Sequence, residues 1–377
     1  MVRHRIAWLP GDGIGPEVLE ATRPVLDASG FKADFLPGHI GWELWKREGT
    51  PLPDRTIELL RNTDCAFLGA VTSKPGPDAQ AELLPAIRAK GARYSSAVLR
   101  IRRLFDLYVC LRPCRAFPGN PQNHREGIDI TIFRENTEGM YAGIEWERVP
   151  QDFFLVRGAE RVPRQAAVTV RSITRKASLR IARAAFEHAA GGPRWRVGGG
   201  TARTEGSRRR VTAVHKANVM RATDGLFLGA VREVAGRYPS VEYEEMLVDS
   251  CALQLLRDPL RFDILLTTNL FGDILSDLCA GLVGGMGFAP SANIGTGYAM
   301  FEPAHGSAPD IAGKGVANPI AAILSAGMML DWLGAAEQAK NIQRAVSEVV
   351  SEGKFRTPDM GGSSSTMEIA SAVCNKL

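Results

Sequence analysis

The stretch HRIAWLPGDGIGPE, residues 4–17, contains the signals of a strand, a turn and a helix in succession. Its first part, His4–Leu9, is a short and mostly apolar run of the kind found in buried strands. Glycines then cluster at positions 11–15, and Pro16 suits the first turn of a helix, where a backbone N–H has no partner to lose. The stretch therefore predicts a strand, a turn and a helix in succession.

Strand-like and helix-like segments alternate in the rest of the chain. The expected strands are Cys65–Val71, Tyr108–Leu111, Ile128–Phe133, Val211–Val214 and Ile264–Thr268. The clearest helices are Ser178–Ala190 and Ala336–Val350. This alternation predicts an α/β protein with a partly parallel sheet, and 377 residues leave room for two lobes with a cleft between them.

Composition excludes several other classes of protein. A hydrophobic fraction of 45% and a charged fraction of 23% are ordinary for a globular protein. The longest uncharged stretch, Leu278–Phe301, is glycine-rich, so we expect buried turns and loop there rather than a membrane helix. The first apolar run ends at Pro10, too early for a signal peptide, and the six cysteines lack metal-ligand spacing. We therefore expect a cytoplasmic protein with reduced thiols and no membrane contact.

The net charge of +5 is concentrated locally, between Arg194 and Lys216. The part of this region within Gly191–Ser207 is rich in Gly, Pro and Arg, as expected of an inserted surface loop. A nucleic-acid partner is the alternative explanation of such a basic run. We favour a solvated loop without chemistry and expect no nucleic acid, because charge runs usually form solvated faces.

The glycine cluster Gly11-x-Gly13-x-Gly15 leaves two interpretations open. A glycine turn after a strand is typical of dinucleotide sites, but the G-x-G-x-x-G spacing and a clear partner acid are absent. The other interpretation is a tight turn that needs the backbone freedom of glycine.

Two carboxylates in NLFGDILSDL, residues 269–278, favour a metal site over the alternative of a purely solvated surface. Asp273 and Asp277 are four residues apart, so on a helix they share one face and repel each other. A divalent cation would remove that repulsion, and Mg²⁺ or Mn²⁺ suits a site with few carboxylates. Asp249 follows an apolar run and is equally consistent with a helix N-cap or with a third ligand.

Three arginines lie in or beside strand-like segments between residues 100 and 134. Arg102, Arg112 and Arg134 would be costly to bury unless each meets an anion, and a guanidinium binds carboxylates with two parallel hydrogen bonds. The alternative is that each pairs with a nearby Asp or Glu. Tyr141 and Lys216 also lie close to expected strand ends. Each alone is usually structural, but together they could supply proton transfers in a desolvated site.

The segment HGSAPDIAG, residues 305–313, is a candidate nucleotide loop. Its glycines and backbone N–H groups could receive phosphates, and Asp310 could bind a ribose diol. A carboxylate there would repel the 2′-phosphate of NADP, so the sequence favours NAD.

Four segments together resemble the β-decarboxylating dehydrogenases, the family of isocitrate, isopropylmalate and homoisocitrate dehydrogenases. They are Leu9–Glu17, Phe133–Ile144, Asn269–Asp277 and Glu302–Ile311, and the resemblance covers essentially the whole chain. It implies a two-lobed α/β fold, distinct from the Rossmann architecture, with a mixed sheet flanked by helices. Residues 1–107 and 284–377 would form a large NAD-binding lobe, and 108–283 a small lobe with the dimer interface and the metal ligands.

The resemblance also implies roles for single residues. In a homodimer with shared active sites, Lys216 and Asp249 would come from the partner subunit, and Lys216 would take part in proton transfer during oxidation. Tyr141 would protonate the enolate left by decarboxylation. The metal ligands would be Asp249, Asp273 and Asp277, and the substrate would be bound by Ser96, Arg102, Arg112, Arg134 and Asn218. NAD would contact Ile14, Thr72, Glu302, His305, Gly306, Ser307, Ala308, Asp310, Ile311 and Asn318.

One departure from the family pattern concerns the substrate. Isocitrate enzymes have a serine and, two residues on, an asparagine that bind the γ-carboxylate, whereas this chain has Ser96 and Val98. Residues 94–98 resemble the loop of homoisocitrate dehydrogenases. Ser96 at a helix N-terminus and Arg100 would suit an anionic γ-group, so we expect homoisocitrate or 3-phosphonomethylmalate. The alternatives are that Arg100 points to solvent, that the substrate is isocitrate, and that the chain is a non-catalytic regulatory subunit.

Overall fold

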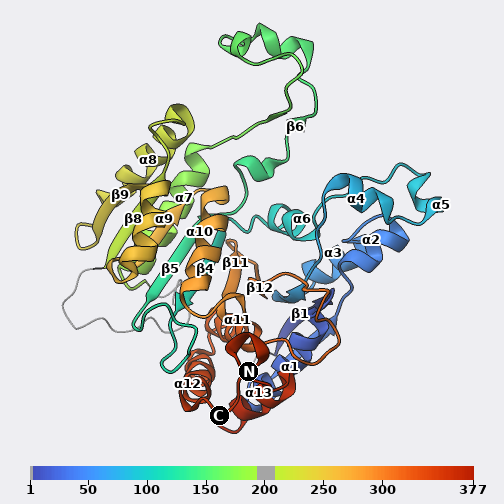
Figure 1. The fold of residues 1–377 in the computed structure, drawn as a ribbon, viewed down its shortest axis with the longest axis vertical. Helices are drawn as coiled ribbons and strands as arrows, with labels where there is room; N and C mark the ends of the chain where they lie inside the picture. The colour runs from blue at the N-terminus through green and yellow to red at the C-terminus, as the bar shows by residue number, and fades with distance from the viewer. Residues whose placement is uncertain (1–2, 193–208) are drawn as a thin grey trace.

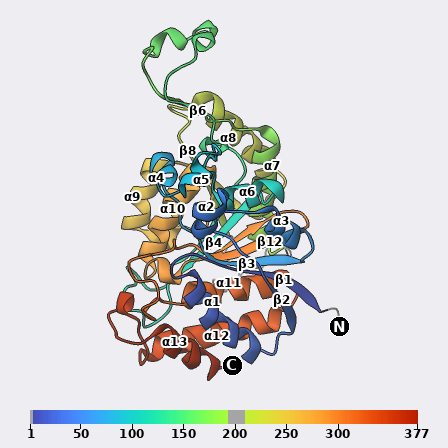
Figure 2. The same ribbon diagram turned by 90° about the vertical axis from the view of Figure 1, so that its right-hand side faces the viewer.

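The computed structural model describes residues 3–192 and 209–377, so the predicted loop Gly191–Ser207 lies almost wholly outside the described residues. One ten-stranded mixed sheet runs through the molecule, and helices cover both of its faces (Figures 1 and 2). The α/β class with a mixed sheet flanked by helices is therefore confirmed. No helix in the described ranges is both long enough and apolar enough to cross a membrane.

The strands of the large sheet occur in the order β2-β1-β3-β12-β11-β4-β5-β10-β8-β9. Antiparallel pairing occurs only where β12, β11, β4 and β5 meet, and the other neighbours in this sheet are parallel. Their bounds are β1 His4–Gly11, β2 Ala33–Pro37, β3 Cys65–Ala70, β4 Val109–Arg115, β5 Asp129–Glu135, β8 Arg210–His215, β9 Glu242–Leu247, β10 Ile264–Thr267, β11 Pro290–Ile294 and β12 Ala299–Pro303. The first five strands of the order come from the two ends of the chain and the last five from its middle, as in the two lobes we propose.

The helices follow the predicted alternation. Their bounds are α1 Gly15–Ala28, α2 Trp42–Glu48, α3 Asp54–Arg61, α4 Gly76–Ala81, α5 Pro85–Arg88, α6 Ala97–Leu104, α7 Arg175–Ala189, α8 Arg221–Ala235, α9 Val248–Arg257, α10 Asn269–Leu282, α11 Ile320–Trp332, α12 Ala336–Glu352 and α13 Thr366–Cys374. A separate arm leaves the body between β5 and α7 (Figure 1). It contains the two-stranded pair β6 Glu145–Trp146 and β7 Val168–Thr169, with the short helix η2 Gln151–Leu155 beyond them.

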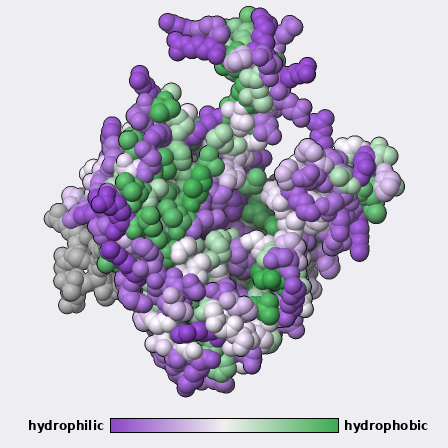
Figure 3. Space-filling view, viewed as in Figure 1, coloured by the Kyte–Doolittle hydropathy of each residue, from purple (hydrophilic) through white to green (hydrophobic). Residues whose placement is uncertain are grey.

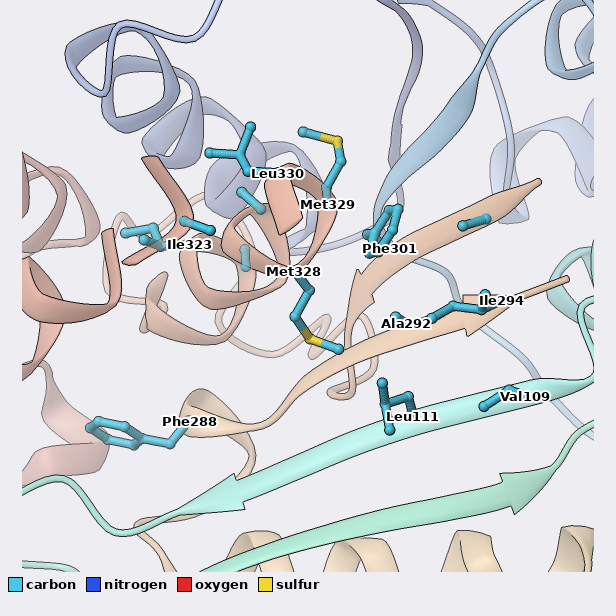
Figure 4. Packing of buried hydrophobic residues seen from close by; sticks show 14 of the residues in the cluster. Val109, Leu111, Phe288, Ala292, Ile294, Phe301, Ile323, Met328, Met329 and Leu330 are labelled. Atoms are coloured by element: carbon cyan, nitrogen blue, oxygen red, sulfur yellow. The ribbon is translucent and has the colours of Figure 1, made fainter. Parts of the chain in front are cut away.

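Side chains on the central strands alternate between two environments, as pleated strands require. Val109, Leu111 and Phe133 belong to the main core, where Figure 4 shows the sheet packed against α11. Ile130 and Ile132 of β5 point to the opposite face and pack against α10 in a second core. Arg112 of β4 and Arg134 of β5 lie on this same opposite face, because side chains of a strand alternate between its two faces. Both arginines therefore lie beneath α10.

The glycine cluster forms a tight turn between β1 and α1. Gly11 and Gly13 have φ of +76° and +57°, in the left-handed region that favours glycine. A Cβ on Gly13 would lie 1.9 Å from the carbonyl oxygen of Ser307, and the Ile14 N–H donates to that oxygen at 2.8 Å. The tight-turn interpretation is therefore confirmed, and the turn packs directly against the loop that follows β12.

The expectation of buried turns and loop for Leu278–Phe301 is wrong. This stretch contains the end of α10, all of β11 and the first part of β12, with glycine turns at Gly284 and Gly285. Both strands are buried at every residue because they lie in the middle of the sheet. A strand covered on both faces shows no alternation of polar and apolar residues, which removes the usual signal.

Candidate active site

Helix α10 lies across the polar face of the sheet and places two acids above it. Its apolar side, including Leu275 and Cys279, packs in the second core, which turns Asp273 and Asp277 toward β4 and β5. A Cβ on Gly272 would lie 2.5 Å from Cγ of Arg134. Glycine at this position therefore allows the helix to approach the buried arginine closely.

Two of the predicted arginines meet α10. Arg134 is 1% exposed, donates through Nε and Nη2 to Oδ1 of Asn269 at 3.0 and 2.6 Å, and pairs with Asp273 through Nη1. Arg112 is also buried, and its Nη1 lies 3.1 Å from Oδ1 of Asp277 and 3.6 Å from Oδ1 of Asp273. The pairing with nearby acids that we considered as the alternative is therefore present.

The third arginine, Arg102, extends from helix α6 toward the same cluster. Arg102 is buried, and its Nη2 donates to Oε1 of Glu302 at 3.3 Å. Among the residues that the structure describes, the buried Nε atoms of Arg102 and Arg112 have no hydrogen-bond partner. An unsatisfied buried donor is unfavourable, so both guanidiniums retain capacity for a further anion.

Tyr141, in the short helix η1 Met140–Ala142, completes the cluster. Its hydroxyl donates to Oδ2 of Asp273, and its ring lies 5.1 Å from the guanidinium of Arg134. Burial and the bond to Asp273 raise the pKa of Tyr141, which keeps the phenol protonated at neutral pH. Burial alone would raise the pKa of Asp273, but the nearby Arg134 and the bond from Tyr141 lower it overall, so this carboxylate is ionised.

Asp277 differs from Asp273 in its electrostatic environment. Burial raises its pKa, and the negative charge of Asp273 adds to that effect, although Arg112 opposes both. Two carboxylates with opposite pKa shifts on one helix face are hard oxygen donors that a divalent cation could share with substrate. The residues present therefore fit Mg²⁺ or Mn²⁺.

Lys216 and Asp249 lie apart from this cluster. Lys216 directly follows β8, and its Nζ donates to Oδ1 of Asp249 at 2.5 Å on an exposed edge. This bond lowers the pKa of Asp249. Asp249 is in the first turn of α9 but is not its N-cap, which is Leu247, so the N-cap interpretation is wrong. Asn218 lies nearby in an exposed turn, and no three His, Cys, Asp or Glu side chains within residues 3–192 and 209–377 are grouped as a metal site.

Three of the predicted nucleotide contacts, Ile14, Thr72 and Ser307, lie where the loop after β12 meets the glycine turn and the end of β3. Thr72 and Ser307 share a hydroxyl hydrogen bond of 2.6 Å, and the Thr72 N–H donates to Asp12 at 2.8 Å. Gly306 and Asp310 are exposed, Ile311 is half-buried, and Ala308 has a φ of +36°. Asn318 is buried and donates to Asp359 at 3.0 Å.

His305 supplies an open acceptor in this loop. Burial lowers its pKa, so the imidazole is neutral at physiological pH. Its Nε2 is buried and has no partner among the described residues, while Nδ1 lies 3.0 Å from the carbonyl oxygen of Gly306. Exposed backbone, a neutral histidine and a free carboxylate fit the adenosine end of a nicotinamide dinucleotide.

The loop before α6 has the predicted cap. Ser96 is the N-cap of α6, and its hydroxyl accepts from Leu99 N at 3.4 Å. Arg100 does not point to solvent as the alternative held, because its Nη1 donates to Thr50 Oγ1 at 3.2 Å and to Leu52 O at 3.1 Å. Val98 is half-buried against the neighbouring apolar cluster.

Two site residues were not found from the sequence. Asn269 begins the segment that contains Asp273 and Asp277, yet only the structure shows that its side chain accepts from Arg134 and donates to Glu138 O at 3.1 Å. Asp224 is completely buried and accepts the backbone N–H of Lys216 at 2.6 Å. An acid within the apolar helix α8 was the available signal for it.

Three buried arginines, a tyrosine and two carboxylates thus meet beside the polar face of an α/β sheet, an arrangement that suits a small acidic ligand. The chain belongs to the isocitrate/isopropylmalate dehydrogenase family, whose model matches residues 5–373. It is therefore an oxidoreductase of a family that decarboxylates small hydroxy acids oxidatively, with a divalent metal and a nicotinamide cofactor.

Relatives of known function match along almost their whole length. The chain is 44% identical to the isocitrate/homoisocitrate dehydrogenase of Thermus thermophilus, covering 99% of this chain and 98% of that protein. It is 42% identical to the NAD isocitrate dehydrogenase catalytic subunit 5 of Arabidopsis thaliana, covering 98% and 87%. The crystal structure of isocitrate dehydrogenase from Methylococcus capsulatus superposes with a TM-score of 0.84 at 39% identity, covering 99% of each chain.

Proposed function

We propose that this chain is an NAD-dependent, Mg²⁺- or Mn²⁺-dependent dehydrogenase that oxidises and decarboxylates an isocitrate-type malate with a changed γ-group, either homoisocitrate or 3-phosphonomethylmalate. The observation that carries the proposal is the cluster of Arg102, Arg112 and Arg134 beside Asp273 and Asp277, with two arginine Nε atoms still available. The changed γ-group in the proposal rests on Val98, which stands where isocitrate enzymes have an asparagine, two residues after Ser96 at the N-cap of α6.

The side chains of this cluster have separable tasks in the proposed reaction. The arginines bind and orient the substrate carboxylates, and their burial excludes water from the reacting carbon. Tyr141 holds a proton that its raised pKa retains at neutral pH, and it delivers that proton to the enolate carbon. Lys216 takes part in moving the hydroxyl proton. A bound Mg²⁺ or Mn²⁺ would polarise the substrate carbonyl, held by Asp273 and Asp277 together with Asp249 of a second copy.

Substrate choice is tested by kinetics at the γ-pocket. NAD reduction with Mn²⁺ present is compared for isocitrate, homoisocitrate, 3-isopropylmalate and 3-phosphonomethylmalate by kcat/KM. We expect homoisocitrate or 3-phosphonomethylmalate to lead, and Val98→Asn to shift preference toward isocitrate. Preference of the unchanged protein for isocitrate would mean that its substrate carries the ordinary γ-carboxylate. No NAD reduction with any of the four acids would favour a regulatory subunit. NADP in place of NAD should give slower reduction because of Asp310.

Arg100 provides a second test of the γ-pocket. Its Nη1 is used by Thr50 and Leu52, so any contact with the γ-group depends on the rest of the guanidinium. Arg100→Ala should lower kcat/KM for the preferred acid if that contact exists. An unchanged kcat/KM would assign Arg100 to holding the loop of residues 50–52 alone.

We also propose a cytoplasmic homodimer with shared active sites. Lys216 and Asp249 pair with each other rather than with a residue of the arginine cluster, exposed apolar residues of α9 and α10 gather on one surface (Figure 3), and the arm extends from the body (Figure 1). Those apolar residues are Leu253, Leu256 and Ile274. All six cysteines are free thiols, which fits a reducing compartment.

Mixing two inactive variants tests the shared site. Lys216→Met and Tyr141→Phe homodimers, combined and allowed to reassociate at random, should regain about a quarter of wild-type activity, because half the dimers then contain one intact site. No recovery from verified mixed dimers would show that each subunit contains its whole site.

A further inference from the structure

A buried ion pair lies between the two parts of the proposed site. Arg171, which follows β7, places Nη1 2.6 Å from Oδ1 of Asp224 in the first turn of α8. The side chain of Asp224 is completely buried, and that of Arg171 is 12% exposed. Because desolvation opposes the attraction within such a pair, it adds little net stability, and its effect lies in what each charge holds in place.

Asp224 holds the backbone of Lys216. Its Oδ2 accepts the Lys216 N–H at 2.6 Å, while the Lys216 carbonyl accepts from the N–H groups of Val219 and Met220 at 3.0 and 2.8 Å. The peptide groups on both sides of Lys216 are thus fixed. The direction in which this side chain leaves the end of β8 depends on the position of Asp224.

Arg171 holds the start of α10. Its Nη2 donates to Oγ1 of Thr268, the N-cap residue of α10, at 3.1 Å, and its guanidinium lies 5.6 Å from the ring centre of Phe271. The same helix carries Asp273 and Asp277. One guanidinium therefore connects the turn that carries Lys216 to the helix that carries the proposed metal ligands.

We propose that Arg171 and Asp224 are positioning residues that fix Lys216 relative to the acids of α10. The proposal rests on the proposed function, in which Lys216 serves the site of the second copy while Asp273 and Asp277 serve their own. The ion pair therefore connects residues that serve two different active sites from within one subunit. It would fix the position of one active site of the dimer relative to the other.

Three variants separate the contact of Asp224 with Lys216 from the contact of Arg171 with α10. Asp224→Asn disturbs the Lys216 side, so we expect kcat to fall about 10- to 100-fold while the Kd for Mn²⁺ stays within about twofold. Arg171→Met disturbs both sides and should lower kcat and weaken Mn²⁺ binding together. Arg171→Lys keeps the charge near Asp224 but is too short for both partners, so it should recover kcat more than Mn²⁺ affinity. KM for the acid should stay within about twofold throughout, because the binding arginines are unchanged.

A readout without turnover distinguishes this proposal from the proposed function. Lysines are labelled by reductive ¹³C-methylation, and the Lys216 signal is assigned with Lys216→Arg. Asp224→Asn should shift this signal, whereas the control Arg175→Met, which breaks the exposed α7–α8 pair with Glu233, should not. If the wild type oxidises no tested acid, the proposed function fails but the signal and the Mn²⁺ titration still test the positioning. If the variants lose only thermal stability and match the control in kcat, Mn²⁺ affinity and Lys216 signal, the positioning role is refuted.

Discussion

Substitution of Gly13 by alanine tests the contact between the glycine turn and the loop after β12. A left-handed φ costs an L-residue roughly 1–2 kcal/mol. The new Cβ would also lie 1.9 Å from the Ser307 oxygen, so one loop must move, at an overpacking cost of about 1–3 kcal/mol. The Ile14–Ser307 hydrogen bond would be lost as well, at about 1 kcal/mol. Together these terms lower the free energy of unfolding by about 3–6 kcal/mol.

The matched control is Gly30→Ala, at the end of α1. Gly30 has a similar φ of +78°, but a Cβ there would meet no atom within 4 Å. This variant should lose only the backbone contribution of about 1–2 kcal/mol. Urea unfolding of both variants gives the two free energies, and their difference isolates the effect of the close approach.

The same pair of variants carries a functional prediction. Displacing the loop that holds His305 and Ser307 should raise the Kd for NAD about tenfold or more in Gly13→Ala and leave it unchanged in Gly30→Ala. Calorimetric titration with NAD measures this. Equal stability losses and equal NAD affinities in the two variants would refute the argument that the turn positions the nucleotide loop.

Three further outcomes are expected. Tyr141→Phe should lower kcat about 100-fold or more with little change in the KM of the acid, measured as NADH formation and CO₂ release, and a change confined to KM would contradict a proton-delivery role. Because burial lowers the pKa of His305 from its ordinary value, the imidazole stays neutral at and above physiological pH, so the Kd for NAD should be constant from about pH 7 to pH 9. A titration in that range that disappears in His305→Gln would show a charged imidazole. Mn²⁺ at about 100 times its Kd should stabilise the protein by about 2.7 kcal/mol, and this gain should vanish in Asp273→Asn.

Local sequence was sufficient for much of the fold. The run from β1 through the glycine turn to α1 was predicted because an apolar stretch, glycines and a proline each favour one local conformation. The strands β3, β4, β5, β8 and β10 and the helices α7 and α12 were placed to within a few residues. Strand β11 was missed because Ser291 and Asn293 look like loop residues, although the sheet buries both. Strand β12 was missed because a strand covered on both faces lacks the alternation of polar and apolar residues.

In the candidate site, too, relations that are local in the sequence could be predicted, whereas those that depend on tertiary packing could not. Asp273 and Asp277 could be paired from their spacing on one helix, since that relation is local. The buried pair of Arg171 and Asp224 joins positions 53 residues apart, and neither residue has a local pattern that indicates its partner. They come together only because the segment that follows β7 packs against α8 and the start of α10.

The order of strands in the large sheet has a consequence for synthesis of the protein. β12 lies between β3 and β11, so the half-sheet begun by the first 70 residues stays open until about 230 further residues have been made. At about 5–20 residues per second this delay lasts roughly 10–50 s. The edge of β3 is exposed throughout, while the strands β4, β5, β8, β9 and β10 can already pair with one another. A nascent chain of this protein should therefore depend on chaperones mainly for its earliest segment, and slowing translation near its end should increase aggregation through β3.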